Sequence, residues 1–394
     1  MRILNKNNQL NLEKTPRELR LIFDILKKDY DINQQSFTHI DWSIFIELAM
    51  HHRIYPVLYG KLKSLDKGIE IPIFVMETLH ELYKRNTFQM LHFSAEMESV
   101  SQLFSKHQIP LLFLKGPTLG YDLYGDISLR TSGDLDVLVP MEKLIYTEKI
   151  LCQAGYQKDD YIKTVLNDWK WRHHHVAYVH PVKKVKLEVH WRLNPGPGKE
   201  PTFNNLWKRK SQNSLTNSVI YTLGKEDLLL FLMTHGARHG WSRLRWLLDV
   251  HQLMNKELDW QSINKQFKTY RYSPIGGQAL ILTANLLNTK IPDELKSSFI
   301  NRRSLNLAKQ ALFYFETMIN LHTEPVPKDV ASYHKHHLFS LMSIQQKLLF
   351  IMSILHPYPE DKETLPLPRQ LHFLYFPLRP LLWAWRKTKA YAFP

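Results

Sequence analysis

The sequence lacks the features that mark secreted and membrane proteins. Its 394 residues include one cysteine, Cys152, which excludes an internal disulfide framework and indicates a reducing compartment. The N-terminal residues contain no apolar segment like that of a secretory signal. No apolar run approaches the roughly 18–20 residues of a membrane span. We therefore expect a cytoplasmic protein without a transmembrane segment.

Acidic residues are also comparatively few. The chain has 37 Asp and Glu against 52 Lys and Arg, which gives a formal net charge of +15. A basic surface favours phosphate-bearing ligands, nucleic acid or an anionic membrane face, although such a surface can also be merely solvated. Hydrophobic residues make up 44% of the chain, enough for a sizeable core, and the length indicates two or three domains.

The hydrophobic pattern divides the chain into helical ends and a central segment of strands. Residues 1–108 are helical in pattern, whereas 109–200 contain short apolar runs and alternating stretches. The Pro/Gly-rich stretch 194–201 is the best boundary signal. Beyond it, we predict that 201–290 form helices that pack on the core. Residues 291–394 are predicted to form a further helical region with a basic, aromatic tail.

Two aspartates lie close together on a predicted strand. Asp134 and Asp136 are two residues apart, so both side chains leave the same face of the strand. Glu188 lies on the polar face of a second strand, and a sheet neighbour could bring it beside the pair. Three carboxylates on a rigid sheet suit Mg²⁺, or Mn²⁺ in its place. Taken alone, the D-x-D triplet also fits a solvated strand face.

The residues before the aspartates suit a phosphate group. A predicted strand ends at Lys115 and Gly116, and glycine permits close approach of the backbone to phosphate. Residues 117–124 are predicted as a short helix whose N-terminus would favour an anion. Arg130 and Ser132 stand just before the aspartates, where they could bind a polyphosphate. Lys115 could equally be a solvated lysine at a strand end.

Four segments together resemble the uncharacterised bacterial nucleotidyltransferase family of the DNA polymerase β-like superfamily. They are LLFLKGPTLGYDLYGDISLRTSGDLDVLV, LEVHWRL, HGARHGWSRLRWLLDVHQL and DWSIFIELAMHHRIYPVLYGKL, all between residues 40 and 290. The resemblance implies an α+β fold, with a small mixed β-sheet core flanked by N- and C-terminal helical regions. It also implies that Lys115 and Gly116 replace the Gly-Ser loop of the superfamily.

The same resemblance implies the activity and its residues. Asp134, Asp136 and Glu188 would be catalytic metal ligands, with Glu188 also a candidate general base. We predict a metal-dependent nucleotidyltransferase that moves NMP from an NTP such as ATP to a hydroxyl-type acceptor and releases pyrophosphate. Lys115 and Arg130, with the metal, would stabilise the charge on the leaving group.

The acceptor and the alternative function stay open at this point. The resemblance favours a small molecule, a sugar or a peptide as acceptor, and an RNA end is also possible. The alternative is a non-catalytic nucleotide- or RNA-binding module on the same fold, which would act through its positive charge.

Several histidines are weaker candidates. His190 shares a strand face with Glu188, where it could tune the site, contact phosphate or simply be a polar side chain. The family resemblance suggests that His235 faces the active site, and a packed core histidine is the alternative. The run His173–His175 has no visible partner cluster in the sequence, so we predict no metal there.

Two further predictions concern structure. Arg245 and Asp249 are spaced for an i,i+4 pair on a helix, which we interpret as structural. The tail at residues 369–394 is expected to pack on its own domain rather than on a membrane or nucleic acid, and its three prolines argue against one regular helix.

Overall fold

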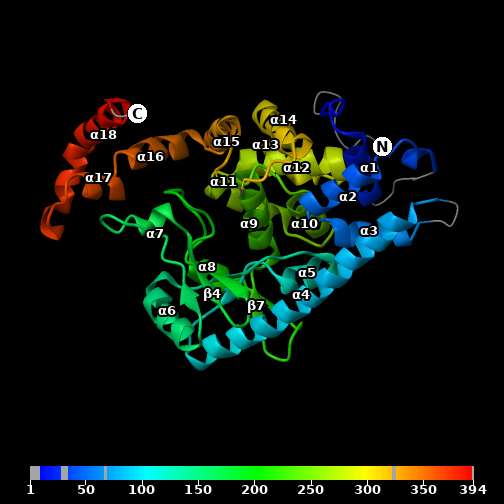
Figure 1. The fold of residues 1–394 in the computed structure, drawn as a ribbon, viewed down its shortest axis with the longest axis horizontal. Coiled ribbons are helices and arrows are strands. Elements are labelled where there is room, and N and C mark those ends of the chain that lie inside the picture. The colour runs from blue at the N-terminus through cyan, green and yellow to red at the C-terminus, as the bar shows by residue number, and fades with distance from the viewer. Residues whose placement is uncertain (1–8, 28–33, 66–68, 322–324, 393–394) are drawn as a thin grey trace.

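The computed structural model describes residues 9–27, 34–65, 69–321 and 325–392. A mixed seven-stranded sheet lies between one long helix, α4 (Ile73–Lys106), and a layer of helices from the second half of the chain (Figure 1). The predicted α+β class is therefore confirmed.

The sheet has the strand order β3-β4-β5-β2-β1-β7-β6. Its central neighbours β2 and β5 are parallel, as are β1 and β7, whereas the other pairs are antiparallel. The bounds are β1 Leu112–Phe113, β2 Leu135–Leu138, β3 Gln157–Lys158, β4 His175–His180, β5 Val185–His190, β6 Ser211–Asn213 and β7 Ile220–Thr222.

Alternation along β2 and β5 gives the sheet one apolar face and one polar face. Leu135, Val137, Leu187 and Val189 are fully buried and belong to a cluster that includes α4 side chains. The polar residues between them face the other way. Strands β6 and β7 correct the expectation of helices alone in 201–290: each has three residues, too few to show a clear alternating pattern.

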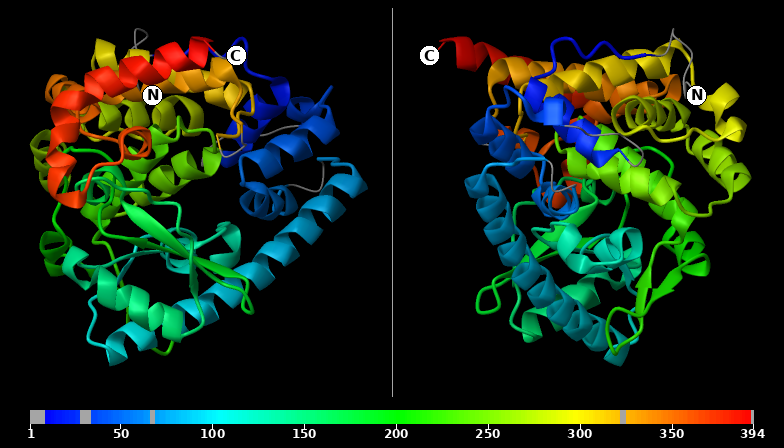
Figure 2. Two further views of the ribbon diagram at one scale, coloured as in Figure 1. Left: turned by 60° about the vertical axis from the view of Figure 1, so that its left-hand side comes forward. Right: turned by 90° about the vertical axis from the view of Figure 1, so that its right-hand side faces the viewer.

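Helices α1 (Arg17–Leu26), α2 (Trp42–His51) and α3 (Tyr55–Lys63) precede α4. The predicted cap of α2 is present, since the Asp41 carboxylate accepts hydrogen bonds from the amides of Ser43 at 2.9 Å and Ile44 at 3.1 Å. Figure 2 shows α4 as a long rod along one side of the sheet, with the later helices on the opposite side.

Shorter helices connect the strands, and a larger group covers the polar face. The connecting helices are α5 Pro117–Tyr124, α6 Leu144–Gln153, α7 Trp169–Arg172 and α8 Phe203–Lys208. The covering group comprises α9 Lys225–Arg238, α10 Leu244–Met254, α11 Trp260–Thr269, α12 Ser273–Leu287, α13 Asp293–Phe299 and α14 Arg302–Glu316. The predicted break between α9 and α10 is confirmed at Gly240, whose φ of 62° favours glycine.

The C-terminal helices form an arm beside this group (Figure 1). They are α15 Lys328–Leu341, α16 Ile344–Ile354, α17 Pro359–Thr364 and α18 Tyr375–Ala392. The tail is not one regular helix, as predicted, because Arg369–Leu374 is a 3₁₀ turn, although Pro380 lies inside the long helix α18. It is bound to α17 through Arg379 and Arg386, which contact Asp361 at 2.6 and 2.7 Å.

Four short 3₁₀ turns complete the described elements: Gln34–Phe37, Ile127–Leu129, Met141–Lys143 and Arg369–Leu374. Within the described part of the chain, every helix is too short or too polar to cross a membrane.

Candidate active site

The parallel pairing of β2 with β5 brings together two of the three predicted acidic residues, Asp136 and Glu188. Asp136 is the direct cross-strand partner of Glu188, although the two are 52 positions apart in the chain. His190 lies two residues beyond Glu188, so it projects from the same face. Asp136 and His190 are 1% and 3% exposed, respectively. The polar face of the sheet therefore carries a buried Asp136–Glu188–His190 cluster.

Cationic and imidazole groups surround the two carboxylates. Asp136 Oδ1 is 3.2 Å from Lys115 Nζ and 3.2 Å from His190 Nε2. Glu188 Oε1 accepts from Lys186 Nζ at 2.7 Å, and Glu188 Oε2 is 3.7 Å from His190 Nε2. Each carboxylate thus has its own lysine, and His190 lies between the two.

These contacts keep both carboxylates anionic. Burial alone would raise the pKa of Asp136, but the Lys115 charge and the His190 hydrogen bond lower it below its usual value. Burial likewise opposes ionisation of Glu188, whose pKa is nevertheless lowered by the nearby His190 and His175 and by the hydrogen bond from Lys186. A lowered pKa makes Glu188 a ready anionic ligand and a weak proton acceptor.

Asp134 lies at the entrance to β2 and has a different environment. Burial and the negative charge of Asp136 raise the pKa of Asp134 to about 6, and Lys115 partly offsets them. The charges of the cluster therefore influence the protonation of Asp134. Its carboxylate does not belong to the set of closely spaced donor atoms that includes Asp136 among the described residues.

The donor set fits a divalent cation. Ligand atoms of Asp136, Glu188 and His190 all lie within 4.8 Å of one another. Asp136 Oδ2 is buried and has no hydrogen-bond partner, which is costly for a carboxylate unless a further ligand completes it. Two carboxylates and an imidazole on a rigid sheet suit Mn²⁺ as well as Mg²⁺.

A second donor group adjoins the first. His174, His175 and His190 also have ligand atoms within 4.8 Å of one another. The sequence showed no partner for the His173–His175 run, because His190 reaches it only through the antiparallel pairing of β4 with β5. His173 is not part of this group.

The predicted phosphate loop adopts the expected backbone. Gly116 has a φ of 105°, which disfavours side chains, and it directly precedes α5. The predicted helix at residues 117–124 is confirmed. Ser132 donates its hydroxyl hydrogen to the carbonyl of Asp134 at 2.9 Å, so it shapes the turn into β2.

The structure places Arg130 in a buried ion pair instead of at the carboxylate cluster. Its Nε is 3.1 Å from both carboxylate oxygens of Asp249, which also accepts from the Tyr124 hydroxyl at 2.9 Å. The predicted ion pair of Arg245 with Asp249 is therefore wrong. Asp249 binds Arg130, and Arg245 donates to the hydroxyl and carbonyl oxygens of Thr131. Arg130 is 2% exposed.

Helix α9 covers the polar face of the sheet and carries the predicted His235, together with Phe231 and Arg238, which the sequence analysis did not single out. Lys115 Nζ lies 5.8 Å from the ring centroid of Phe231 on this helix. His235, one turn later, is 9% exposed, and burial followed by the Lys115 charge lowers its pKa well below 6.5. Arg238 donates from Nη1 to His174 Nε2 at 3.1 Å. The i,i+3 spacing of His235 and Arg238 places both side chains on one face of the helix, and this spacing could have identified Arg238 from the sequence.

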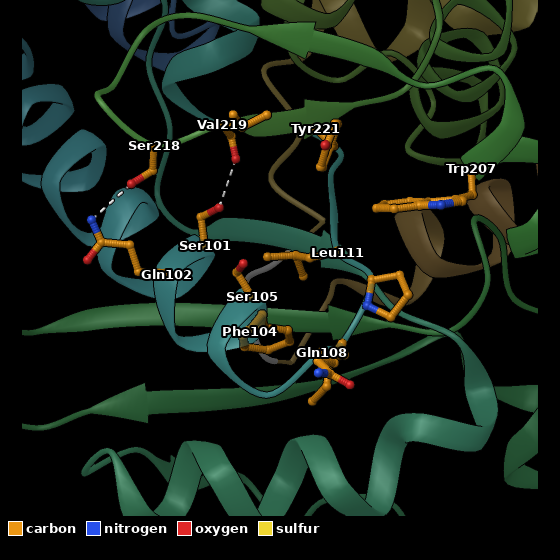
Figure 3. A pocket seen from close by; sticks show the side chains of 12 residues that line it. Ser101, Gln102, Phe104, Ser105, Gln108, Leu111, Trp207, Ser218, Val219 and Tyr221 are labelled. Atoms are coloured by element: carbon orange, nitrogen blue, oxygen red, sulfur yellow. Dashed lines mark hydrogen bonds between the residues drawn. The ribbon is translucent and has the colours of Figure 1, made fainter.

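A large pocket lies away from the carboxylate cluster. It encloses about 700 Å³ near the end of α4 and the start of β1, whereas Lys115 follows the other end of β1. Figure 3 shows Trp207 and Tyr221 on one side and Ser101, whose hydroxyl donates to the Val219 carbonyl at 3.1 Å, on the other. None of its 12 lining residues is charged, so this pocket does not suit a nucleotide triphosphate.

Comparison with known proteins identifies the family. The model of a family described as uncharacterised nucleotidyltransferase matches residues 38–288, which is more than half of the chain. The chain belongs to this nucleotidyltransferase family. The enzyme class and the use of an NTP follow from that membership, in agreement with the sequence prediction. No curated protein matches the chain.

Solved structures similar to this nucleotidyltransferase share little sequence. An antigenic nucleotidyltransferase-like protein from Paracoccidioides brasiliensis has 14% identity and a TM-score of 0.33, over 53% of this chain and 97% of that one. JHP933 from Helicobacter pylori has 18% identity and a TM-score of 0.27, over 64% and 97%. MenT4, a nucleotidyltransferase toxin from Mycobacterium tuberculosis, has 13% identity and a TM-score of 0.28, over 68% and 92%.

Proposed function

We propose that this protein is a divalent-metal-dependent nucleotidyltransferase that transfers NMP from an NTP to a hydroxyl group, with Asp136, Glu188 and Asp134 as its metal-binding carboxylates. The observation that carries the proposal is the buried, unpartnered Oδ2 of Asp136 beside Glu188 and His190. A bound Mg²⁺ or Mn²⁺ would supply positive charge against the phosphates of the substrate.

The reaction is a displacement at the α-phosphorus. The acceptor hydroxyl oxygen forms a bond to this phosphorus, and the bond from phosphorus to the bridging oxygen breaks. The electron pair of that bond leaves with pyrophosphate, while the hydroxyl proton passes to a base. Lys115, which follows β1 and precedes the loop at Gly116, is placed to offset charge on the departing phosphates. His190 orients Asp136 through its hydrogen bond.

The test is pyrophosphate release from each of the four NTPs with Mg²⁺ or Mn²⁺, in the presence of candidate hydroxyl acceptors. The variants are Asp136→Asn, Glu188→Gln and Asp134→Asn, and Asp122→Asn is the matched control. Asp122 lies on α5 and is bonded to Asn213 at 2.7 Å, outside the cluster. We expect the control to retain activity and the variants of Asp136, Glu188 and Asp134 to lose it. Equal activity in all the variants would refute the proposal.

The salt dependence of nucleotide binding distinguishes a non-catalytic binding module from the proposed enzyme. If basic side chains alone hold nucleotide or RNA, affinity falls steeply with salt because phosphate contacts release counterions. A metal-centred site predicts Mg²⁺-dependent NTP binding that changes little with salt and is lost in Asp136→Asn.

A further inference from the structure

A second pocket is connected to the carboxylate cluster through Arg238 and His174. It encloses about 330 Å³, within the range of small-molecule sites. Its walls come from the loop at residues 194–198, the end of α9, the start of α12 and the arm helices α15 and α16. Elements that are distant in sequence therefore build one concave site.

Arg238 connects this pocket to the cluster. It lines the pocket and donates to His174 Nε2 at 3.1 Å. The His174 ring lies 5.3 Å, between centroids, from His190, which in turn contacts Asp136 at 3.2 Å. A short chain of side chains thus leads from the pocket to the proposed reaction centre.

Among the described residues, Arg238 has no direct ion pair, although Glu188 and Glu200 act on its charge from a greater distance. No carboxylate of the described residues lies within 4.0 Å of it. Its Nη1 and Nη2 donate to imidazole nitrogens of His174 at 3.1 Å and His235 at 3.4 Å, and neither partner is a carboxylate. Its Nε is buried and has no partner. A half-buried guanidinium whose Nε has no partner favours an anionic ligand.

The other cation at the pocket is already neutralised. Arg172 is bonded to Asp168 and donates to the carbonyls of Ser353 and His356. The remaining wall is mainly apolar and aromatic, with Tyr272, Ile275, Leu338, Leu341, Met342 and Phe350 among its residues. Among the described residues that line the pocket, Arg238 is the one cation without a carboxylate within 4.0 Å. A single such cation among apolar walls suits one carboxylate attached to an apolar body, and is too little charge for a triphosphate.

We propose that this pocket is the acceptor site, and that Arg238 binds a carboxylate on an acceptor whose apolar body fills the pocket. The inference rests on the proposed function and adds the chemical class of the acceptor. The carboxylate could belong to a free organic acid or to the C-terminus of a peptide, and binding experiments distinguish the two.

Binding is measured by calorimetry without NTP, so the result does not depend on catalysis. The probes are phenylbutyrate and its amide, and an acetylated dipeptide ending in phenylalanine with a free or an amidated C-terminus. We expect at least one acid to bind about tenfold or more tightly than its amide. The preferred acid identifies the source of the carboxylate. Binding must persist in Asp136→Asn, which removes transfer but not the pocket.

Two variants locate the binding. Arg238→Gln should abolish the preference for the acid. Arg302→Gln makes the same charge change at an exposed arginine on α14 and should leave that preference unchanged. Gly198→Leu tests the pocket without touching Arg238. A side chain at position 198 would point toward Gln346 and Tyr272, at 3.6 and 3.8 Å from its Cβ, so it should block both acids and leave Mg²⁺–ATP binding intact.

Three results would overturn the inference: equal binding of acids and amides, unchanged acid binding in Gly198→Leu, or an Arg238→Gln variant that loses ATP affinity but keeps acid affinity. Loss of activity in the Asp136 variant with acid binding retained supports both proposals. Retained activity in that variant with acid binding present would refute only the proposed function.

Discussion

Two buried aspartates in this molecule have opposite environments. Asp249 accepts hydrogen bonds on both carboxylate oxygens, from Arg130 and Tyr124. Asp136 is equally buried, but only its Oδ1 is partnered, by Lys115 and His190, and its Oδ2 is bare. A carboxylate with hydrogen bonds to both oxygens stabilises the fold, whereas a carboxylate with one unpartnered oxygen is available to a ligand.

The comparison also shows why substitutions of Asp249 and Asp136 should affect different properties of the protein. Removing Asp249 strands a cation that the fold has buried. Removing the charge of Asp136 takes away a carboxylate that the fold only partly satisfies. Stability should therefore depend on Asp249, and metal binding and activity on Asp136.

The largest expected effect is on stability. Asp249→Asn leaves the Arg130 guanidinium buried without a counter-charge, and we expect a loss of about 3 kcal/mol in the free energy of unfolding. Urea titration followed by circular dichroism measures it. The double variant Arg130→Met/Asp249→Leu should recover much of this loss. A double variant less stable than the single one would contradict the interpretation that the loss comes from an unpaired, buried Arg130.

Next in size is the effect of Asp136→Asn on catalysis. We expect pyrophosphate release to fall by about 100-fold or more, because the metal loses a buried ligand, while the free energy of unfolding changes little. Asp249→Asn, assayed at a temperature where it is folded, should retain most of its activity per folded molecule. Similar activity losses in the two variants would erase the distinction between the two sites.

A smaller effect is stabilisation by metal. At 100 times its dissociation constant, Mn²⁺ should add about 2.7 kcal/mol to the unfolding free energy of the wild type. Asp249→Asn should gain the same increment, and Asp136→Asn should gain little. Thermal unfolding with and without Mn²⁺ provides the measurement, and an equal shift in all three proteins would assign the metal to another site.

The smallest effect concerns protonation outside both clusters. Burial lowers the pKa of His337 to about 4, despite its hydrogen bond to the Ala237 carbonyl at 3.2 Å and with His334 nearby. Between pH 6.5 and 4 the unfolded chain binds a proton that the folded chain does not, so stability falls as pH falls. Each such histidine contributes up to about 1.4 kcal/mol per pH unit.

His337→Gln isolates that contribution. The unfolding free energy of the variant should decline less steeply than that of the wild type between pH 6.5 and 5. Coincident slopes would show that His337 does not remain neutral in the folded protein.

Sequence reasoning reached the local features that follow from spacing. The alternation around Asp134 and Asp136, the glycine before α5 and the break at Gly240 are set by neighbouring residues, and the structure contains the corresponding elements. The strand face of Glu188 was also readable, because it depends only on the period of two.

The remaining features depend on long-range pairing. Arg130 stands four residues before Asp134, yet its partner Asp249 lies on α10, more than one hundred residues later. Arg238 reaches His174 only because α9 folds over the sheet. Strand β7 forms by pairing with β1, and the edge strand β6 forms by pairing with β7, so neither is defined by its own sequence.

The most direct test of the metal-centred account is anomalous X-ray scattering from crystals grown with Mn²⁺ and a non-hydrolysable NTP analogue. The account predicts a peak about 2.1 Å from Asp136 Oδ2, with a Glu188 oxygen also in its coordination sphere. An ordered nucleotide with no manganese at Asp136, or manganese bound only by His174 and His175, would contradict it.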